Sequence, residues 1–162
     1  MRVETTRFGD LDVDEDQIFE FPMGLLGFAE HKKYVVIDHS AESPFKWLQS
    51  IKDPELAFII TDPLFFKADY HIEVRQSELH VVAPIEEVDL VLSVIMTIPE
   101  NAREMSANLL APLLFNMKNR TAMQYVLTNK KYPVKYYVLR EQEGDAVEAP
   151  PEGVEPKAIS LS

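Results

Sequence analysis

The sequence predicts a mainly β fold, an antiparallel β-barrel-like single domain with a few short helices. Apolar residues alternate with polar ones over many short runs, and this period of two is that of a strand. Gly, Pro, Asp and Asn separate the runs at short spacing, which is typical of a sandwich or barrel. The chain has 162 residues, 46% of them hydrophobic, which is enough for one domain with a substantial core.

Eight strands are expected in the first hundred residues. Their ranges are Arg2–Phe8, Asp10–Asp14, Gln17–Phe21, Tyr34–Ile37, Phe45–Ser50, Leu56–Ile60, Tyr70–Val74 and Val88–Ile98. Alternation places Leu11 and Val13 on one face of the second strand. The apolar run Leu56–Ile60 predicts a strand in the centre of a sheet, and Val88–Ile98 is the longest candidate.

Helical signals are short and few. The candidate ranges are Phe28–Lys33, Ser77–Val82, Glu86–Asp89 and Pro99–Met105, and the second and third are ambiguous. Pro99 would stand at the start of the last of them, where a missing N–H costs nothing.

A hairpin is expected after residue 106. Ala107–Met117 forms one strand, Lys118–Thr121 the turn and Ala122–Leu127 the returning strand. A helix is disfavoured because Pro112 in its interior would cost about 3 kcal/mol. In a strand, Pro112 belongs on an edge or at a bulge, where no ladder donor is needed.

The chain divides into a barrel domain over residues 1–140 and an acidic, Pro- and Gly-rich C-terminal tail over residues 141–162. The tail composition cannot bury enough apolar surface to offset chain entropy, so a flexible or loosely docked tail is expected. Its last residues, Ala158–Ser162, alternate like a short strand and are able to join a sheet edge.

Charge and composition limit the classes of partner and the cell compartment. The net charge is −11, so direct binding to nucleic acid is not expected, whereas a basic protein partner would be attracted. The acidic residues are uneven, since residues 101–140 hold seven Lys and Arg and one acidic side chain. The chain has no cysteine, no apolar signal core and no run long enough to cross a membrane. A cytoplasmic protein is therefore expected.

No enzyme or cofactor motif is present, and no cofactor or metal is expected. The triplet Asp10-x-Asp12-x-Asp14 resembles the start of a calcium loop, but Glu15 replaces the required glycine and Phe21 the final acid. Aspartates on the solvent side of a strand explain the triplet better. The histidines have no metal-ligand spacing.

Three aromatic positions bear on binding. Trp47 is expected in the core. Leu64 and Phe65 follow a proline turn; core burial is the preferred interpretation, and exposure would make them a protein-binding patch. An alternative function, a small ligand-binding or enzymatic barrel, would use a pocket lined by Trp47 and Phe58.

Several motifs in order resemble the flagellar assembly factor FliW family. They are FPMGLLGF (Phe21–Phe28), SPFKWLQS (Ser43–Ser50), DPELAF (Asp53–Phe58) with Asp62-Pro63, MSANLLAP (Met105–Pro112), Asn116-x-Lys118-Asn119-Arg120 and Asn129-x-x-Tyr132-Pro133. The resemblance spans roughly Thr6 to Tyr137 and does not include the tail. It implies a β-barrel-like domain without catalytic activity.

The resemblance also implies partners. FliW proteins bind flagellin in the cytoplasm and, once flagellin is exported, bind CsrA, a small basic RNA-binding repressor, so that flagellin mRNA is translated. Dispersed acidic residues favour binding outside the RNA cleft of CsrA over mimicry of RNA. A flagellin chaperone without a translational role is a further alternative.

Candidate contact residues come from the hairpin and the aromatic turn. They are Asn108, Asn116, Lys118, Asn119, Arg120, Leu64 and Phe65. A second hypothesis gathers the basic side chains of the hairpin region near one end of two neighbouring strands, as a site for an acidic partner or the tail. These side chains are Lys118, Arg120, Lys130, Lys131 and Lys135.

Overall fold

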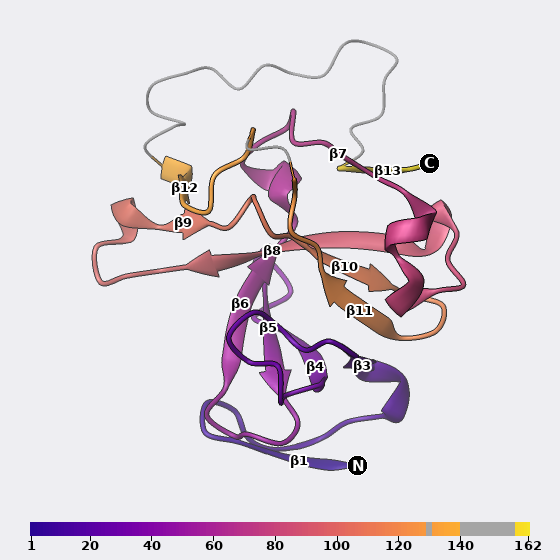
Figure 1. Ribbon diagram of the computed structural model, residues 1–162. Coiled ribbons are helices and arrows are strands. Elements are labelled where there is room, and N and C mark those ends of the chain that lie inside the picture. The colour runs from indigo at the N-terminus through magenta and orange to yellow at the C-terminus, as the bar shows by residue number, and fades with distance from the viewer. Residues whose placement is uncertain (129–130, 140–157) are drawn as a thin grey trace.

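The structure is a computed structural model that describes residues 1–128, 131–139 and 158–162. Thirteen strands are described (Figure 1). They are β1 (Arg2–Thr5), β2 (Gly9–Asp12), β3 (Ile18–Glu20), β4 (Lys33–Asp38), β5 (Phe45–Ser50), β6 (Ala57–Thr61), β7 (Ile72–Val74), β8 (Leu90–Thr97), β9 (Ser106–Ala107), β10 (Leu113–Asn116), β11 (Thr121–Gln124), β12 (Tyr136–Tyr137) and β13 (Ile159–Leu161).

Short 3₁₀ helices connect some of the strands. They are η1 (Glu15–Gln17), η2 (Pro63–Phe65), η3 (Gln76–Glu78), η4 (His80–Val82), η5 (Glu87–Asp89) and η6 (Ala102–Glu104). The expectation of a few short helices is confirmed, and each of these has only three residues.

Seven strands close into a barrel in the order β10, β11, β3, β4, β5, β6 and β8. Closure comes from β8, which pairs with β10 as well as with β6. The pairings are antiparallel except for one parallel contact, Thr121 with Glu20, between β11 and β3. The predicted fold class, a mainly β antiparallel barrel, is confirmed.

Aromatic side chains fill the barrel interior. Inward-facing positions of the strands form one core cluster, which contains Phe19, Phe21, Tyr34, Leu48, Ile60, Leu113, Phe115 and Ala122. Phe115 meets Phe19 and Phe21 edge to face, with ring centroids 5.0 Å and 5.7 Å apart. Hydrocarbon side chains therefore occupy the space that a large central ligand cavity would need.

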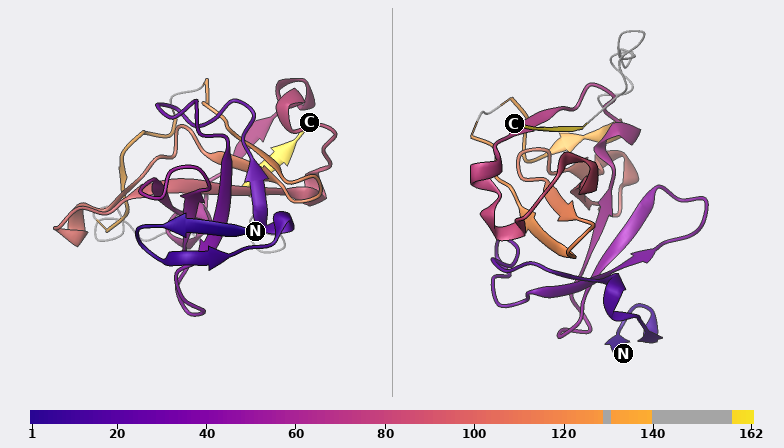
Figure 2. Two further views of the ribbon diagram at one scale, coloured as in Figure 1. Left: turned by 90° about the horizontal axis from the view of Figure 1, so that it is seen from below. Right: turned by 90° about the vertical axis from the view of Figure 1, so that its right-hand side faces the viewer.

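Two further cores lie outside the barrel. The larger one covers the outer face of β8, where Leu90, Leu92, Val94 and Met96 point away from the barrel interior. The smaller one lies beneath the β1–β2 hairpin and contains Val3, Val13 and Val35. Figure 2 shows the N-terminal hairpin and the β7–β13 pair at opposite ends of the molecule.

Most expected elements are found close to their predicted ranges. β5 has the predicted bounds, β6 is central between β5 and β8, and β8 is the longest described strand. The helix expected over Phe28–Lys33 is wrong, because that segment makes turns held by bonds such as His31 N–H to the Phe28 carbonyl (3.1 Å). Pro99 does not begin η6, whose cap is Asn101.

The expected single strand over Ala107–Met117 is also wrong. A bend over residues 108–112 divides it into β9 and β10, and Asn108 Oδ1 stabilises that bend by accepting the Ala111 N–H at 3.1 Å. Pro112 stands just before the β10 ladder begins, so its missing N–H breaks no pairing. The hairpin itself is confirmed in β10 and β11.

The tail is described only at its end. β13 pairs with β7, as expected for a strand that joins a sheet edge. The expected boundary between residues 140 and 141 and the rest of the tail lie outside the described residues, so the division into domain and tail stays a prediction. Among the described residues, no helix is long and apolar enough to cross a membrane.

Tyr34 offers a test of the barrel interior. Its ring is fully buried, its hydroxyl has no hydrogen-bond partner among the described residues, and burial raises the pKa of Tyr34 to about 12. A tyrosine in the unfolded chain ionises near pH 10, whereas Tyr34 in the folded protein ionises near pH 12. The folded state therefore loses stability relative to the unfolded state as the pH rises from about 10 to about 12. The limiting loss is about 3 kcal/mol. Tyr34→Phe should match or exceed the wild type at pH 7 and lose less stability above pH 10.

Urea unfolding of both proteins between pH 7 and pH 12 measures this difference. Other tyrosines, such as Tyr125, whose pKa burial raises to about 12, keep some alkaline instability in the variant. An identical pH dependence in both proteins would contradict the role given to Tyr34.

Candidate protein-binding surface

Two asparagines fix the turn between β10 and β11. Asn116 Nδ2 donates to the carbonyls of Val82 (2.8 Å) and Pro84 (3.0 Å), and its Oδ1 accepts the Lys118 N–H (3.0 Å). Asn119 Nδ2 donates to the Val82 carbonyl at 3.2 Å. The turn is therefore tied to the η4 segment, which is more than thirty residues earlier in the chain.

The turn residues differ in exposure. Asn116 is 0% exposed, and its side chain holds the turn in position; its expected contact with a partner stays a prediction. Lys118 and Asn119 are exposed, and Arg120 is half-buried at a positive φ of 60°. The guanidinium of Arg120 lies over the Phe19 ring, 5.1 Å from its centroid.

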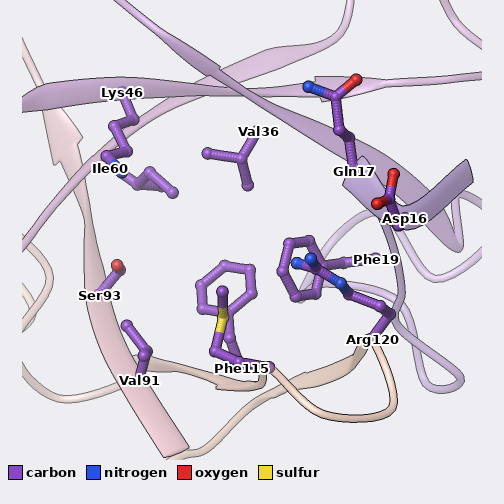
Figure 3. A pocket seen from close by; sticks show the side chains of 11 residues that line it. Asp16, Gln17, Phe19, Val36, Lys46, Ile60, Val91, Ser93, Phe115 and Arg120 are labelled. Carbon is purple, nitrogen blue, oxygen red and sulfur yellow. The ribbon is translucent and has the colours of Figure 1, made fainter. Parts of the chain in front are cut away.

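A hollow of about 240 Å³ opens at the mouth of the barrel beside Arg120 (Figure 3). Its lining is Phe19, Val36, Ile60, Val91, Ser93 and Phe115, with Asp16, Gln17, Lys46, Met117 and Arg120 around them. Lys46 and Arg120 lie on opposite sides of the hollow in Figure 3. The mouth is thus an apolar depression with two cations and one carboxylate at its rim.

A second hollow adjoins the first through Val91, which lines both. Leu64, Val88, Leu90 and Leu92 contribute apolar lining, and Asp62 and Glu87 contribute carboxylates. Three exposed apolar side chains, Met117, Val91 and Val88, line these two hollows, and exposed Phe65 is next in the chain to Leu64 of the second hollow; we call these four the apolar strip. Exposed apolar residues that gather in this way mark protein-binding surfaces.

The aromatic turn contributes the end of the strip. Asp62 accepts the Leu64 N–H at 2.9 Å and so caps η2. Phe66 is buried and stacks on Tyr136, whereas Phe65 is 67% exposed and Leu64 is half-buried. The preference for core burial is therefore wrong for Phe65, and the turn presents it to solvent.

The structure places two of the predicted groups at different hollows that share Val91. Lys118, Asn119 and Arg120 follow Met117, which lines the first hollow with Arg120, and Leu64 lines the second with Phe65 beside it in the chain. Asn108 is not among them, because it is half-buried at the bend before β10, with its N–H on the Ile95 carbonyl.

The basic side chains are not gathered at one end of the hairpin. Lys118 and Arg120 belong to the turn, whereas Lys131 lies past the other end of β11, over the Tyr132 ring at 5.4 Å. Lys130 lies outside the described residues. The hypothesis of one basic site at the turn is therefore wrong for Lys131.

Comparison with known proteins assigns the family. The family model described as "FliW: FliW protein" matches residues 2–138, most of the chain. This chain belongs to the FliW family. The resemblance found in the sequence motifs is confirmed.

Relatives cover nearly the whole of this FliW chain. The protein named "Flagellar assembly factor FliW" from Alkaliphilus metalliredigens is 38% identical over 142 residues, which is 87% of this chain and 88% of the relative. The protein of the same name from Caldanaerobacter subterraneus is 40% identical over 87% of this chain and 95% of its own.

A solved structure agrees. A crystal structure of the flagellar assembly factor FliW matches with a TM-score of 0.78 and 32% identity, and the match covers 85% of this chain and 96% of that one.

The pocket that the alternative function would place between Trp47 and Phe58 does not form in this FliW domain. In the β5–β6 ladder Trp47 stands opposite Ile59 and Leu48 opposite Phe58, so the two aromatic rings lie on opposite faces. Phe58 packs on Phe28, with centroids 5.2 Å apart. Trp47 is half-buried on the outer face, where the Arg7 guanidinium lies 4.2 Å from its ring, so its expected core position is wrong.

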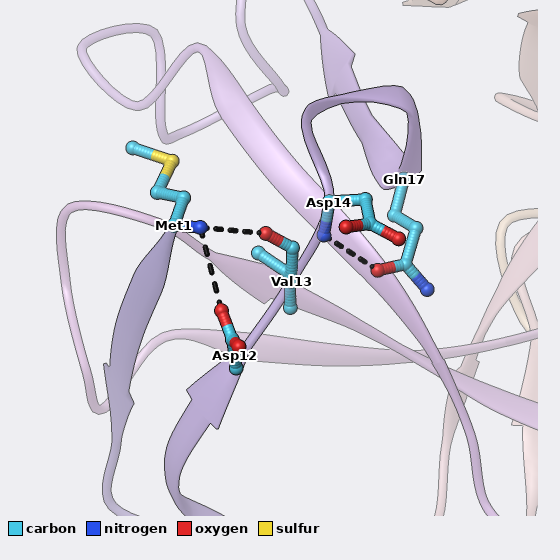
Figure 4. Close-up of polar contacts among 5 residues, drawn as sticks. All are labelled: Met1, Asp12, Val13, Asp14 and Gln17. Carbon is cyan, nitrogen blue, oxygen red and sulfur yellow. Dashed lines mark hydrogen bonds and ion pairs between the residues drawn. The ribbon is translucent and has the colours of Figure 1, made fainter.

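The aspartates of the triplet have structural partners in the N-terminal hairpin and at η1, and Figure 4 draws those of Asp12 and Asp14. The Met1 amino group lies 3.4 Å from Asp12 Oδ1 and donates to the Val13 carbonyl, and Asp10 pairs with Arg2. Asp14 is the N-cap of η1 and its N–H donates to Gln17 Oε1. Within the described part of the chain, no group of three or more His, Asp or Glu side chains is placed to hold a metal ion.

The sequence reasoning missed Met117, Val88 and Val91. Alternation along β8 gave a usable signal, because it places Val91 on the opposite face of the strand from Leu90 and Leu92, which belong to the outer core. Val88 precedes the strand in η5, and no local pattern shows that its side chain is 85% exposed.

Proposed function

We propose that this protein is a flagellar assembly factor that works by binding other proteins. In the cytoplasm it binds flagellin and, when free of flagellin, it binds the translational regulator CsrA and relieves repression of flagellin mRNA translation. The observation that carries the proposal is the family match over residues 2–138, together with relatives named flagellar assembly factor that cover most of the chain.

Surface chemistry supports a protein-binding role. The apolar strip and the two hollows supply the apolar centre that a protein interface needs, and charged side chains surround it. The net charge of −11 suits a basic partner and hastens the encounter with it. The packed barrel interior supports the same conclusion.

We assign the contacts to the apolar strip and its ends. Direct contacts come from the strip, and from Leu64, Lys118, Asn119 and Arg120 next to it. Asn116 and Asn108 act indirectly, because they hold the turn and the bend in place.

The test is co-elution of the purified protein with CsrA, with flagellin and with both on a sizing column. We expect a complex with each partner, and flagellin should displace CsrA from the protein. Absence of both complexes would refute the proposal. A complex with flagellin alone would instead support the alternative function, a flagellin chaperone without a translational role.

Charge placed in the apolar strip should break the interface. Val88→Glu and Met117→Glu should each weaken the binding of at least one partner by about tenfold or more, because an apolar contact is replaced by a carboxylate that loses its water. Both side chains are exposed, so folding should be unchanged. Titration calorimetry with CsrA and with flagellin measures the loss.

Val134→Glu is the matched control, since Val134 is also exposed but lies outside the strip. If Val134→Glu weakened binding as much as Val88→Glu, the strip would not be the interface.

A further inference from the structure

The edge of β7 holds a short strand that comes from the far end of the chain. β13 lies parallel to β7 with Ile159, Ser160 and Leu161 opposite Ile72, Glu73 and Val74 (Figure 1). The Ile72 N–H donates to the Ala158 carbonyl (2.9 Å) and the Gln76 N–H to the Ser162 carbonyl (3.1 Å). In the described part of the chain β7 has no other strand partner.

Side chains of the domain form the groove in which β13 lies. Ile159 is buried in the outer core and borders the second hollow beside Leu64 and Leu90. The backbone of β13 is held on its other side as well, because Glu87 Oε1 accepts the Leu161 N–H at 2.8 Å. The site thus contacts an extended backbone from both sides, and the outer core packs against its alternate apolar side chains, Ile159 and Leu161.

The groove belongs to the family domain, and its occupant does not. β7, Leu64, Glu87 and Leu90 all lie within residues 2–138, whereas β13 begins at Ile159. An edge that is built by the domain and filled by a three-residue appended strand resembles a strand-addition site with a ligand in it.

The surroundings define the ligand. The carboxylates of Asp62, Glu73 and Glu87 stand near the groove, since two of them line the second hollow and Glu73 is opposite Ser160. A negatively charged rim favours a segment with Lys or Arg beside its apolar residue. The pattern that fits is an extended segment with Ile or Leu at alternate positions and basic flanks.

We propose that the β7 edge is a binding site for such an extended basic segment of another protein, and that β13 is an intramolecular competitor for the same edge. The site goes beyond the proposed function, because it does not depend on which partners use the apolar strip. A tethered strand acts at an effective concentration of about millimolar, so a free segment binds well only after β13 leaves.

The experiment uses the full chain and a labelled synthetic peptide, KAISLSK, as the probe. Ile159→Asp places a charge in the apolar groove and should release β13 while the barrel stays folded. Fluorescence anisotropy should then show the peptide binding at least about tenfold tighter to Ile159→Asp than to the wild type. Val134→Asp, at an exposed position away from the groove, should behave like the wild type.

Hydrogen exchange checks that the strand has moved. The amides of Ile72 and Gln76 should exchange faster in Ile159→Asp and slow again when peptide is added. Ser160→Pro, a second variant within β13, should give the same result by preventing the strand from pairing. A peptide with Asp in place of Ile, or with glutamate flanks, should bind more weakly.

Two outcomes would overturn the proposal. One is equal peptide affinity for wild type and variants, or no binding to a variant whose Ile72 amide has lost protection. The other is an Ile72 amide that stays protected in both variants, which would make β13 a fixed part of the fold.

Discussion

Gly24→Ala is expected to lower the free energy of unfolding by roughly 2–5 kcal/mol. Gly24 has a φ of 66°, a conformation that costs a residue with a Cβ about 1–2 kcal/mol. A Cβ at this position would also stand 2.6 Å from Ala29 Cα, which is backbone and cannot move aside cheaply. The turn would have to open, and this would displace Leu25, which is buried in the barrel core.

Gly27→Ala is the matched control in the same turn. Its φ is 84°, but no atom beyond its two neighbours in the chain lies within 4 Å of the added Cβ, so only the backbone cost of about 1–2 kcal/mol applies. Urea unfolding of both variants measures the difference between them. Equal destabilisation would show that the close approach to Ala29 is not a constraint on the fold.

Asn116→Ala is expected to cost roughly 2–4 kcal/mol of stability. The change removes the fully buried Asn116 amide donor from the carbonyls of Val82 and Pro84, and it takes the side-chain acceptor from the Lys118 N–H. Among the described residues, only the Val82 carbonyl keeps another donor, the Asn119 amide. The turn that carries Lys118, Asn119 and Arg120 would loosen, so partner binding should fall together with stability.

Asn119→Ala separates the two roles. Asn119 is exposed, and the hydrogen bond from its side-chain amide to the Val82 carbonyl is longer, at 3.2 Å. Asn119→Ala should therefore cost about 1 kcal/mol of stability. Thermal unfolding and partner titration of both variants give the answer. If Asn116→Ala kept its stability and lost partner binding alone, Asn116 would be a contact residue after all.

Local patterns in the sequence were enough for most strands. The alternation in Phe45–Ser50 and Asp10–Asp14 reports which side of a strand is apolar, and that depends only on neighbouring residues. The same reasoning found the strand at Ile159–Leu161 within a tail of otherwise unsuitable composition. It failed at Phe28–Lys33 and over Ala107–Met117, where turns and a bend interrupt the pattern.

The candidate site was predicted only in part. The motif Asn116-x-Lys118-Asn119-Arg120 pointed to the turn between β10 and β11, but it did not reveal that Asn116 faces inward towards Val82 and Pro84. Likewise the run Leu64-Phe65-Phe66 gave no means of telling Phe65, which is exposed, from Phe66, which is buried. Burial at these positions is set by segments far away in the chain.

By itself the sequence determined the mainly β class, the family, the absence of known catalytic motifs and the acidic character of this protein, because each depends on residue types and short spacings. Only the tertiary structure decided that β8 closes the barrel on β10, that Val91 joins two hollows, and that β13 lies on β7. Those features come from pairings between residues that are distant along the chain, and the alternation within a strand does not encode which other strand it will meet.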